Sequence, residues 1–352
     1  MKRILLLSNM FPHASNVASG VFVEKMMYQL IDDEQLDVDI CVLRPQRYKL
    51  VAYLSFYLRA FWSMLIGPNY ILYCHFVSHT GLLALIGRYL FCQKVVLNCH
   101  GSDIVIPAKT GGYVHKLNAI TLRCADKVIV PSNSFAQLVH EKFGLARERL
   151  FVYPSGGVFY PSTFKSSNRG WSKDPITFGY VGSLSLAKGF QIITRSMNKI
   201  DFRCRLLVAG PGDIKLISSI KNSNVEVVYC GVLDREKLNQ LYAEIDFLLF
   251  PTLLEESLGL TPIEAMAFGV PVVASKIGAV TEYIANRKNG FFIEPGSVDD
   301  MTNALMRIAD LTAAEYASLR SCARKVAAEY DENKIVKEYR LVFQKVCNDG
   351  KT

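Results

Sequence analysis

The sequence has no uncharged apolar run close to the roughly 20 residues that a membrane-spanning helix requires. Its first apolar run covers only residues 4–7, which is too short for the core of a secretory signal peptide and is better explained as a buried strand. We therefore expect a cytoplasmic protein without transmembrane segments, which would meet the inner face of a membrane only as a peripheral protein.

The cysteines and glycines also lack familiar patterns. The nine cysteines form no CxxC pair and no regular framework, so we expect small buried residues in a reducing compartment and neither a disulfide nor a zinc site. The G-x-G-x-x-G fingerprint expected after an early strand of an NAD-dependent oxidoreductase is missing, which disfavours that class.

What the sequence does contain is typical of a well-packed globular protein. Half of its residues are hydrophobic and 20% are charged, which excludes a disordered chain. Its length of 352 residues is long for one core and suits two domains of ordinary size.

The net charge of +8 is concentrated in the first half of the chain. Residues 1–165 carry 17 Lys and Arg against 10 Asp and Glu, a balance that attracts nucleic acid or anionic lipid. Residues 44–72 mix bases with aromatic residues, as helices at membrane interfaces do. The bases are Arg44, Arg47, Lys49 and Arg59, and the aromatic residues include Tyr48, Tyr53, Phe56, Tyr57, Phe61 and Trp62.

Two explanations of this stretch remain open, a surface that contacts anionic lipid and a buried helix whose aromatic residues belong to the core. Nucleic acid is not expected as a partner, because none of the usual recognition motifs is visible and the bases do not cluster in a K/R-rich run.

Short apolar runs alternate with segments of helix length along the chain, which predicts parallel, doubly wound α/β sheets. In the first half the expected strands are residues 3–9, 37–43, 70–76, 94–101, 127–132 and 150–157. In the second half they are residues 176–184, 203–212, 225–231, 246–252, 271–278 and 290–296. We expect two Rossmann-like domains facing one another across a cleft, with ligands beyond the carboxyl ends of the strands.

Residues 161–175 are rich in Ser, Pro, Lys and Gly and lack periodicity, so we place the domain junction there. The expected domains are residues 1–165 and residues 170–333.

The stretch EESLGLTPIE, residues 255–264, carries three acids and no base. Thr261 fits the N-cap of a short helix and Pro262 its first turn. The N–H groups at a helix start carry partial positive charge, and Gly259 would let a ligand approach the backbone, so a pyrophosphate fits there.

The two acids at the ends of this pattern have different explanations. Glu264 is either the capping-box partner of Thr261 or a ligand-binding carboxylate. Glu256 has no capping function, and a carboxylate beside an anion site is best explained by hydrogen bonds from sugar hydroxyls.

The stretch EESLGLTPIEAMAFGVPVVAS resembles the E-x7-E region of the retaining glycosyltransferases of family 4, which have the two-Rossmann-domain fold called GT-B. In the same half, VGSLSLAKGF resembles the family's glycine-lysine turn, and LLVAGPGD the strand and turn that follow it. In the first half, FPHASNVASGVFVEK resembles the glycine-containing first loop, and CHGSD the histidine loop of a subset with HGSD. The last segment, residues 334–352, resembles the terminal helix that crosses back onto the N-terminal domain. The resemblance spans nearly the whole chain.

The resemblance implies an acceptor-side N-terminal domain and a C-terminal domain that binds a nucleotide-sugar donor. Glu264 would bind the ribose hydroxyls, and the amides around Gly259, Leu260 and Thr261 would take the diphosphate.

The resemblance also implies the groups that act on the reacting sugar. Lys188 would neutralise the diphosphate as the sugar leaves, and Glu256 would hold sugar hydroxyls. The family usually has an arginine where this chain has Ser183, so one of two expected cations is missing. Either Lys188 and the helix start suffice, or a further base such as Lys276 contributes.

Three residues of the first domain complete the expected site. His100 would face the donor sugar, although a lone histidine is often structural. Gly20 would let the first loop approach the donor, although a helix-start glycine would look the same. Asp103 is expected to bind the donor or to serve only as a turn residue.

No DxD-like pair suited to a metal-bridged diphosphate is seen, so we expect no metal and no cofactor, with positive charge supplied by Lys188 and backbone amides. The family implies retention at the anomeric carbon. It favours a UDP-sugar over a GDP-sugar as donor, and the basic aromatic stretch favours a glycan or lipid-linked glycan acceptor.

Two competing functions share the expected architecture. A GT-B-like UDP-sugar epimerase would have the same nucleotide side, but the E-x7-E spacing with Lys188 favours transfer. A non-catalytic binder of sugars or sugar nucleotides would also have a cleft.

Overall fold

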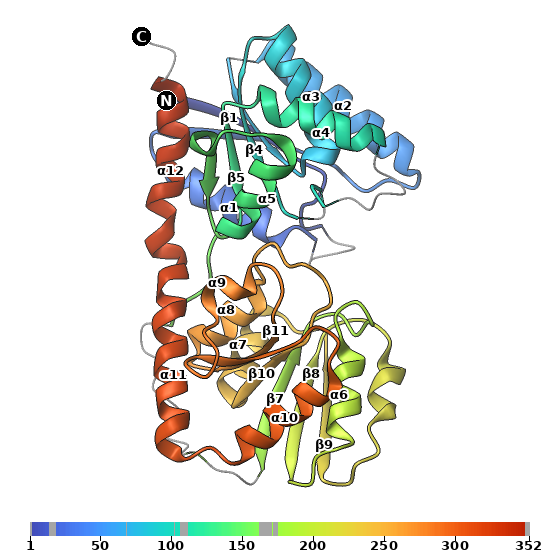
Figure 1. Ribbon diagram of the computed structural model, residues 1–352. Coiled ribbons are helices and arrows are strands. Elements are labelled where there is room, and N and C mark those ends of the chain that lie inside the picture. Colours follow the sequence, from blue (N-terminus) through green and yellow to red (C-terminus); the bar gives the residue numbers. More distant parts are fainter. Residues whose placement is uncertain are drawn as a thin grey trace. The chain divides into compact units, whose positions relative to one another are not determined.

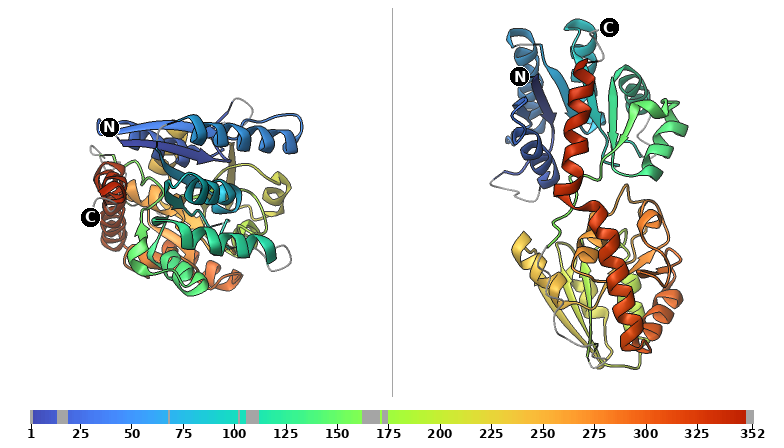
Figure 2. Two further views of the ribbon diagram at one scale, coloured as in Figure 1. Left: turned by 90° about the horizontal axis from the view of Figure 1, so that it is seen from above. Right: turned by 90° about the vertical axis from the view of Figure 1, so that its left-hand side faces the viewer.

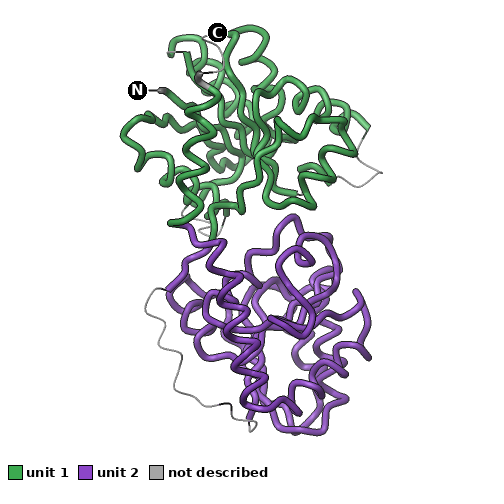
Figure 3. The backbone as a smooth tube through the Cα atoms, turned by 60° about the vertical axis from the view of Figure 1, so that its left-hand side comes forward, with its two compact units in different colours: residues 1–157, 333–352 green, residues 158–332 purple. Residues whose placement is uncertain are grey.

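The computed structural model describes residues 2–13, 19–67, 69–101, 103–105, 112–161, 171 and 175–348. The chain forms two compact units, residues 1–157 with 333–352 and residues 158–332 (Figure 3). The predicted junction at 161–175 lies mostly outside the described residues.

The first unit is built on a six-stranded parallel sheet in the order β2-β1-β3-β4-β5-β6 (Figure 1). Its strands are β1 (Lys2–Ser8), β2 (Leu36–Val42), β3 (Ile71–His75), β4 (Lys94–Asn98), β5 (Lys127–Val130) and β6 (Leu150–Val152). Its helices are α1 (Val21–Ile31), α2 (Lys49–Ile66), α3 (Val77–Leu90), α4 (Gly112–Cys124), α5 (Asn133–Phe143) and most of α12 (Glu332–Asn348).

Both faces of this sheet are covered because buried side chains alternate along its strands. In β1, Leu5 and Leu7 pack into the core under α2 to α5, whereas Ile4 and Leu6 pack into the core under α1 and α12. The two views in Figure 2 show α1 and α12 on one face and α2 to α4 on the other. The six strands expected in the first half of the sequence are all present.

The second unit repeats the design with the strand order β12-β11-β10-β7-β8-β9, again parallel throughout. Its strands are β7 (Ile176–Val181), β8 (Cys204–Ala209), β9 (Val225–Gly231), β10 (Phe247–Phe250), β11 (Val272–Ser275) and β12 (Gly290–Ile293). Its α-helices are α6 (Phe190–Met197), α7 (Arg235–Glu244), α8 (Leu260–Ala267), α9 (Val280–Tyr283), α10 (Val298–Ala309) and α11 (Ala313–Ala327). The prediction of two Rossmann-like parallel-sheet units is therefore confirmed.

Candidate functional site

In the second unit, the predicted residues gather on two loops at the carboxyl edge of the sheet. Ser183 and Lys188 follow β7, and residues 256–261 follow β10, the strand that pairs with β7. The backbone N–H of Leu253 donates to the carbonyl oxygen of Ala187 at 3.0 Å, which ties the two loops together. The sheet order therefore brings these segments side by side despite about 70 residues of sequence between them.

Gly189 allows this close approach of the two loops. It caps the N-terminus of α6 with a φ of 73°, in the left-handed region that favours glycine. A Cβ atom here would lie 1.8 Å from the carbonyl oxygen of Pro251, at the end of β10. A side chain at this position would force the loop carrying Lys188 away from the loop carrying Glu256.

The side chains of Lys188 and Glu256 form an ion pair, with 2.6 Å between Nζ and Oε1. Their side chains are 30% and 17% exposed, so solvent reaches both only partly. The hydroxyl of Thr252 donates to the same carboxylate oxygen at 3.1 Å. Two residues that the sequence analysis placed in one site are thus in direct contact, with the carboxylate fixed by a second donor.

The helix after β10 begins two residues earlier than predicted. Gly259 is the N-cap of α8, with a φ of 76° and no side-chain cap, and Leu260 is the first helical residue. Thr261 and Glu264 are therefore both helical and cannot form the predicted capping box, in which the acid must be the third residue after the cap. The prediction of Thr261 as N-cap was wrong, because the left-handed conformation of Gly259 sets the start of the helix.

Tyr283 fixes the conformation of Gly259. Its buried hydroxyl donates to the carbonyl oxygens of Leu258 and Gly259 at 3.0 and 2.9 Å. Burial raises the pKa of Tyr283 well above its usual value, so the phenol remains a donor. A Cβ atom on Gly259 would lie 2.9 Å from the tyrosine oxygen. The start of α8, where the first N–H groups of any helix lack intrahelical partners, is thereby held in place.

Glu264 has a partner that the sequence did not reveal. The hydroxyl of Tyr242, on α7, donates to Oε2 of Glu264 at 3.0 Å. Tyr242 is buried, and burial followed by the charge of Glu264 raises its pKa well above the usual value. The tyrosine therefore keeps its proton and holds the carboxylate of Glu264, a half-buried residue in the middle of α8.

Ser183 is half-buried on the loop after β7, where the family usually has arginine. Its Oγ lies 3.4 Å from Oγ of Ser185, and its carbonyl oxygen accepts a hydrogen bond from Tyr180 at 2.7 Å. Ser185 in turn accepts from the N–H of Lys188 at 3.3 Å, so the serines shape this turn. Lys276, the alternative base, is exposed directly after β11, the neighbour of β10.

In the first unit, His100 lies just beyond β4 and next to a second histidine. Its Nε2 is 3.0 Å from Nδ1 of His75, the last residue of the neighbouring strand β3. Phe22 and Phe76 pack on the His100 ring with centroid distances of 4.8 and 4.5 Å. Burial lowers the pKa of His100 to about 3, so the ring is neutral at neutral pH.

Asp103 supports the backbone around His100. It is 2% exposed, and its carboxylate accepts the N–H groups of His100 and Val77, each at 2.9 Å. Burial raises its pKa to about 6, although these backbone hydrogen bonds oppose that change. The carboxylate thus ties the loop after β4 to the start of α3, which favours its expected turn role over donor binding.

Gly20 caps α1 with a φ of 69°, and a Cβ atom there would lie 2.7 Å from the backbone of Met10. The close contact with Met10 would by itself require glycine at position 20, whether or not the first loop approaches a donor. The preceding residues 14–18 of the predicted first loop, and Ser102 of the histidine loop, lie outside the described residues.

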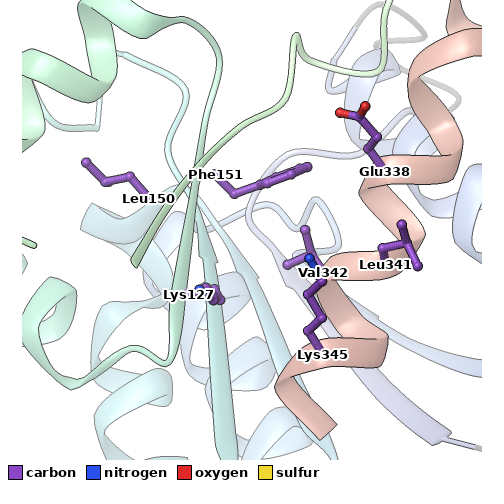
Figure 4. A pocket seen from close by; sticks show the side chains of 7 residues that line it. All are labelled: Lys127, Leu150, Phe151, Glu338, Leu341, Val342 and Lys345. Atoms are coloured by element: carbon purple, nitrogen blue, oxygen red, sulfur yellow. The ribbon is translucent and has the colours of Figure 1, made fainter. Parts of the chain in front are cut away.

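Among the described residues, no group of three or more metal-ligating side chains occurs, and no helix is long and apolar enough to cross a membrane. A cavity of about 330 Å³ lies in the first unit between α12 and the sheet edge at β5 and β6 (Figure 4). Its lining residues are Lys127, Leu150, Phe151, Glu338, Leu341, Val342 and Lys345, and none of them is a predicted site residue.

Four residues that contact the predicted site escaped the sequence analysis, namely His75, Tyr242, Thr252 and Tyr283. For Tyr242, Thr252 and Tyr283, no pattern in the sequence distinguishes the residue itself from its neighbours. His75 had a usable signal, because it is a polar residue at the end of an otherwise apolar strand.

Two family models match the chain. Residues 162–326 match "Glycosyl transferases group 1", and residues 29–156 match "Glycosyltransferase Family 4". Together they cover most of both units.

Individual proteins agree with these models. An uncharacterized glycosyltransferase of Methanocaldococcus jannaschii is 31% identical over 172 residues, covering 47% of this chain and 44% of that protein. The N-acetyl-alpha-D-glucosaminyl L-malate synthase of Bacillus anthracis is 24% identical over 297 residues, covering 80% of this chain and 76% of that protein. The chain thus spans less than half the length of the first relative.

Among solved structures, the Anabaena protein HepE in complex with UDP superimposes with a TM-score of 0.73 at 18% identity, covering 98% of this chain and 100% of that chain. This likeness concerns the fold, and it agrees with the two parallel-sheet units. By the two family models, the chain belongs to the glycosyltransferases of group 1 and family 4, and it has their GT-B fold.

Proposed function

We propose that the protein transfers a sugar, with retention, from a UDP-sugar to a hydroxyl group of a glycan or lipid-linked glycan. The observation that carries this proposal is the ion pair of Lys188 and Glu256 beside the start of α8. The lysine and the N–H groups at the start of the helix can bind a diphosphate, and the carboxylate can accept hydrogen bonds from sugar hydroxyls. All three lie on adjacent loops, so one donor molecule can contact them together. The complex of HepE with UDP supports this choice of base.

In the proposed reaction, the first-turn amides of α8 bind the diphosphate, and Lys188 stabilises the negative charge that grows on it as the glycosidic bond breaks. Glu256 orients Lys188 before the donor binds and accepts hydrogen bonds from the sugar. Glu264, held by Tyr242, accepts hydrogen bonds from the ribose. The acceptor hydroxyl attacks on the face that the nucleotide leaves, and the departing phosphate oxygen helps to take its proton. Lysine and amides would supply the positive charge without a metal ion.

The test is to incubate the protein with UDP- and GDP-sugars, with and without glycan acceptors, and to measure nucleotide release and product stereochemistry by NMR. Transfer requires UDP release that the acceptor accelerates, an anomeric configuration unchanged from the donor, and full activity in EDTA. An epimerised sugar without a new bond would identify an epimerase. Binding that raises the melting temperature without any turnover would identify a binder.

A further inference from the structure

The outward side of α2 is almost entirely apolar. The helix buries Ala52, Phe56, Ala60 and Met64 against the first sheet. Its exposed residues are Lys49 and seven apolar residues, here called the α2 ridge. The ridge consists of Leu50, Val51, Leu54, Leu58, Trp62, Leu65 and Ile66, with exposed fractions of 48 to 81%. Helices on a protein surface normally turn charged and polar residues outward, so this face lacks the partner that its composition requires.

The ridge differs from the aromatic surface that the sequence suggested. Phe56 is fully buried, and the hydroxyls of Tyr53 and Tyr57 bond to His79 of α3. Arg59 is half-buried and donates to the carbonyl oxygen of Val42 at 2.9 Å. Most of the aromatic residues therefore face the protein, and the outward row is formed mainly by leucine at intervals of four residues.

Positive charge stands at one end of the ridge. Arg44, Arg47 and Lys49 are all exposed, and none of them forms an ion pair with a described residue. No Asp or Glu occurs between Asp39 and Asp103, so this part of the chain offers them no acidic partner in the sequence. The apolar row thus runs along a helix about 27 Å long, at 1.5 Å per residue, and begins beside three cations that have no acidic partner among the described residues. Arg47 stacks on the ring of Tyr48 and remains exposed.

We propose that the α2 ridge docks the protein onto an anionic lipid bilayer, with the helix lying in the plane of the interface. The acyl region would cover the leucines and Trp62, and acidic headgroups would pair with Arg44, Arg47 and Lys49. A second copy of the chain fits less well, because it would bring another surface with the same cations and no acids to pair with them.

Vesicle flotation tests this proposal with the full-length protein. At low salt, it should float with vesicles of phosphatidylcholine and phosphatidylglycerol in equal amounts and stay unbound with phosphatidylcholine alone. Each base near an anionic surface strengthens binding about fivefold, so changing Arg44, Arg47 and Lys49 together to Gln should weaken it roughly 100-fold. The double variant Leu54→Gln, Leu58→Gln should weaken it at least about tenfold.

A matched control comes from the second unit, where Ile214 and Val232 are exposed to a similar degree, 56 and 67%. The variant Ile214→Gln, Val232→Gln should bind vesicles like the unchanged protein. Equal loss in both double variants, or an unchanged protein that fails to float, would overturn the proposal. So would a dimer in light scattering that Leu54→Gln, Leu58→Gln dissociates, because the ridge would then bind a second copy.

The proposed sugar transfer is tested separately. Hydrolysis of a soluble UDP-sugar without vesicles should be the same for the ridge variants and the unchanged protein. A ridge variant that loses membrane binding but keeps full hydrolysis would therefore show that the α2 ridge binds lipid without affecting the proposed sugar transfer.

Discussion

The imidazole rings of His75 and His100 lie within 10° of parallel, with 3.0 Å between Nδ1 of the first and Nε2 of the second. His75 is completely buried, and its Nε2 has no hydrogen-bond partner among the described residues. Burial holds the pKa of both rings well below the usual range, so both are neutral at neutral pH. One neutral ring must then donate to the other, and His75 fixes the tautomer that His100 presents.

Replacing His75 should separate this positioning role from stability. We expect His75→Phe to lower kcat about tenfold, because His100 loses the hydrogen bond that fixes its tautomer, with little change in the KM of the donor. The melting temperature should change little, since one buried nitrogen without a partner is removed while Nε2 of His100 loses its partner. The matched control is His115→Phe in the same unit, whose ring packs against Phe143. Unchanged kinetics in both variants would mean that the histidine pair is only structural.

Changing either member of the ion pair on the second unit should cost turnover. Glu256→Gln and Lys188→Gln are each expected to lower kcat about 100-fold, because the charge that stabilises the leaving diphosphate is lost or misplaced. Stability should change by about 1 kcal/mol or less, since both side chains are partly exposed. Because the two act as one unit, the double variant should be little worse than either single one, as steady-state kinetics would reveal. Additive losses would argue that the residues act independently.

Glu264→Gln should weaken donor binding instead, with about a tenfold rise in KM and a smaller change in kcat. Tyr242→Phe should raise KM in the same direction but less, because the carboxylate loses one donor. Tyr316→Phe is the matched control, since that buried hydroxyl also contacts a carboxylate, Asp246, at 3.1 Å in the same unit. It should lower stability without changing KM. If the three variants had the same KM for the donor, Glu264 would not be part of the donor site.

The fold was predictable because buried parallel strands carry continuous apolar runs, and all twelve were recognised from such runs. Lys188 and Glu256 were assigned to one site from the family resemblance. The structure brings them into contact because β7 and β10 are neighbours, so the loops after them meet at one edge of the sheet. The start of α8 was missed because Thr261 and Glu264 imitate a capping box, whereas the true start depends on Tyr283, 24 residues from Gly259. Contacts of this kind, like that of Tyr242 with Glu264, arise only from packing and leave no local pattern.

The stability of the first unit should depend on pH through Asp103. Its pKa of about 6 in the folded protein exceeds the ordinary value near 3.8, so its contribution is present below about pH 4 and is lost as the pH rises through 6. His75 and His100 act in the opposite direction, because their lowered pKa values cost stability as the pH falls below about 6.5. Comparing the unchanged protein with Asp103→Asn cancels the histidine contributions. The variant should be less stable, and its deficit in urea unfolding should be about 2 kcal/mol larger at pH 4.5 than at pH 7.5. A deficit independent of pH would contradict this.

Gly189 and Gly231 allow a clean separation of backbone strain from steric contact. Both lie in the second unit with φ values of 73 and 72°, but a Cβ atom on Gly231 would meet nothing within 4 Å. Gly231→Ala should therefore cost only the left-handed conformation, about 1 kcal/mol. Gly189→Ala adds a clash with the carbonyl oxygen of Pro251, so we expect at least about 2 kcal/mol more in urea unfolding. It should also lower kcat strongly, because Pro251 leads into the loop that carries Glu256, whereas Gly231→Ala should keep full turnover. Equal turnover in the two variants would show that the spacing of the two loops does not matter to the reaction.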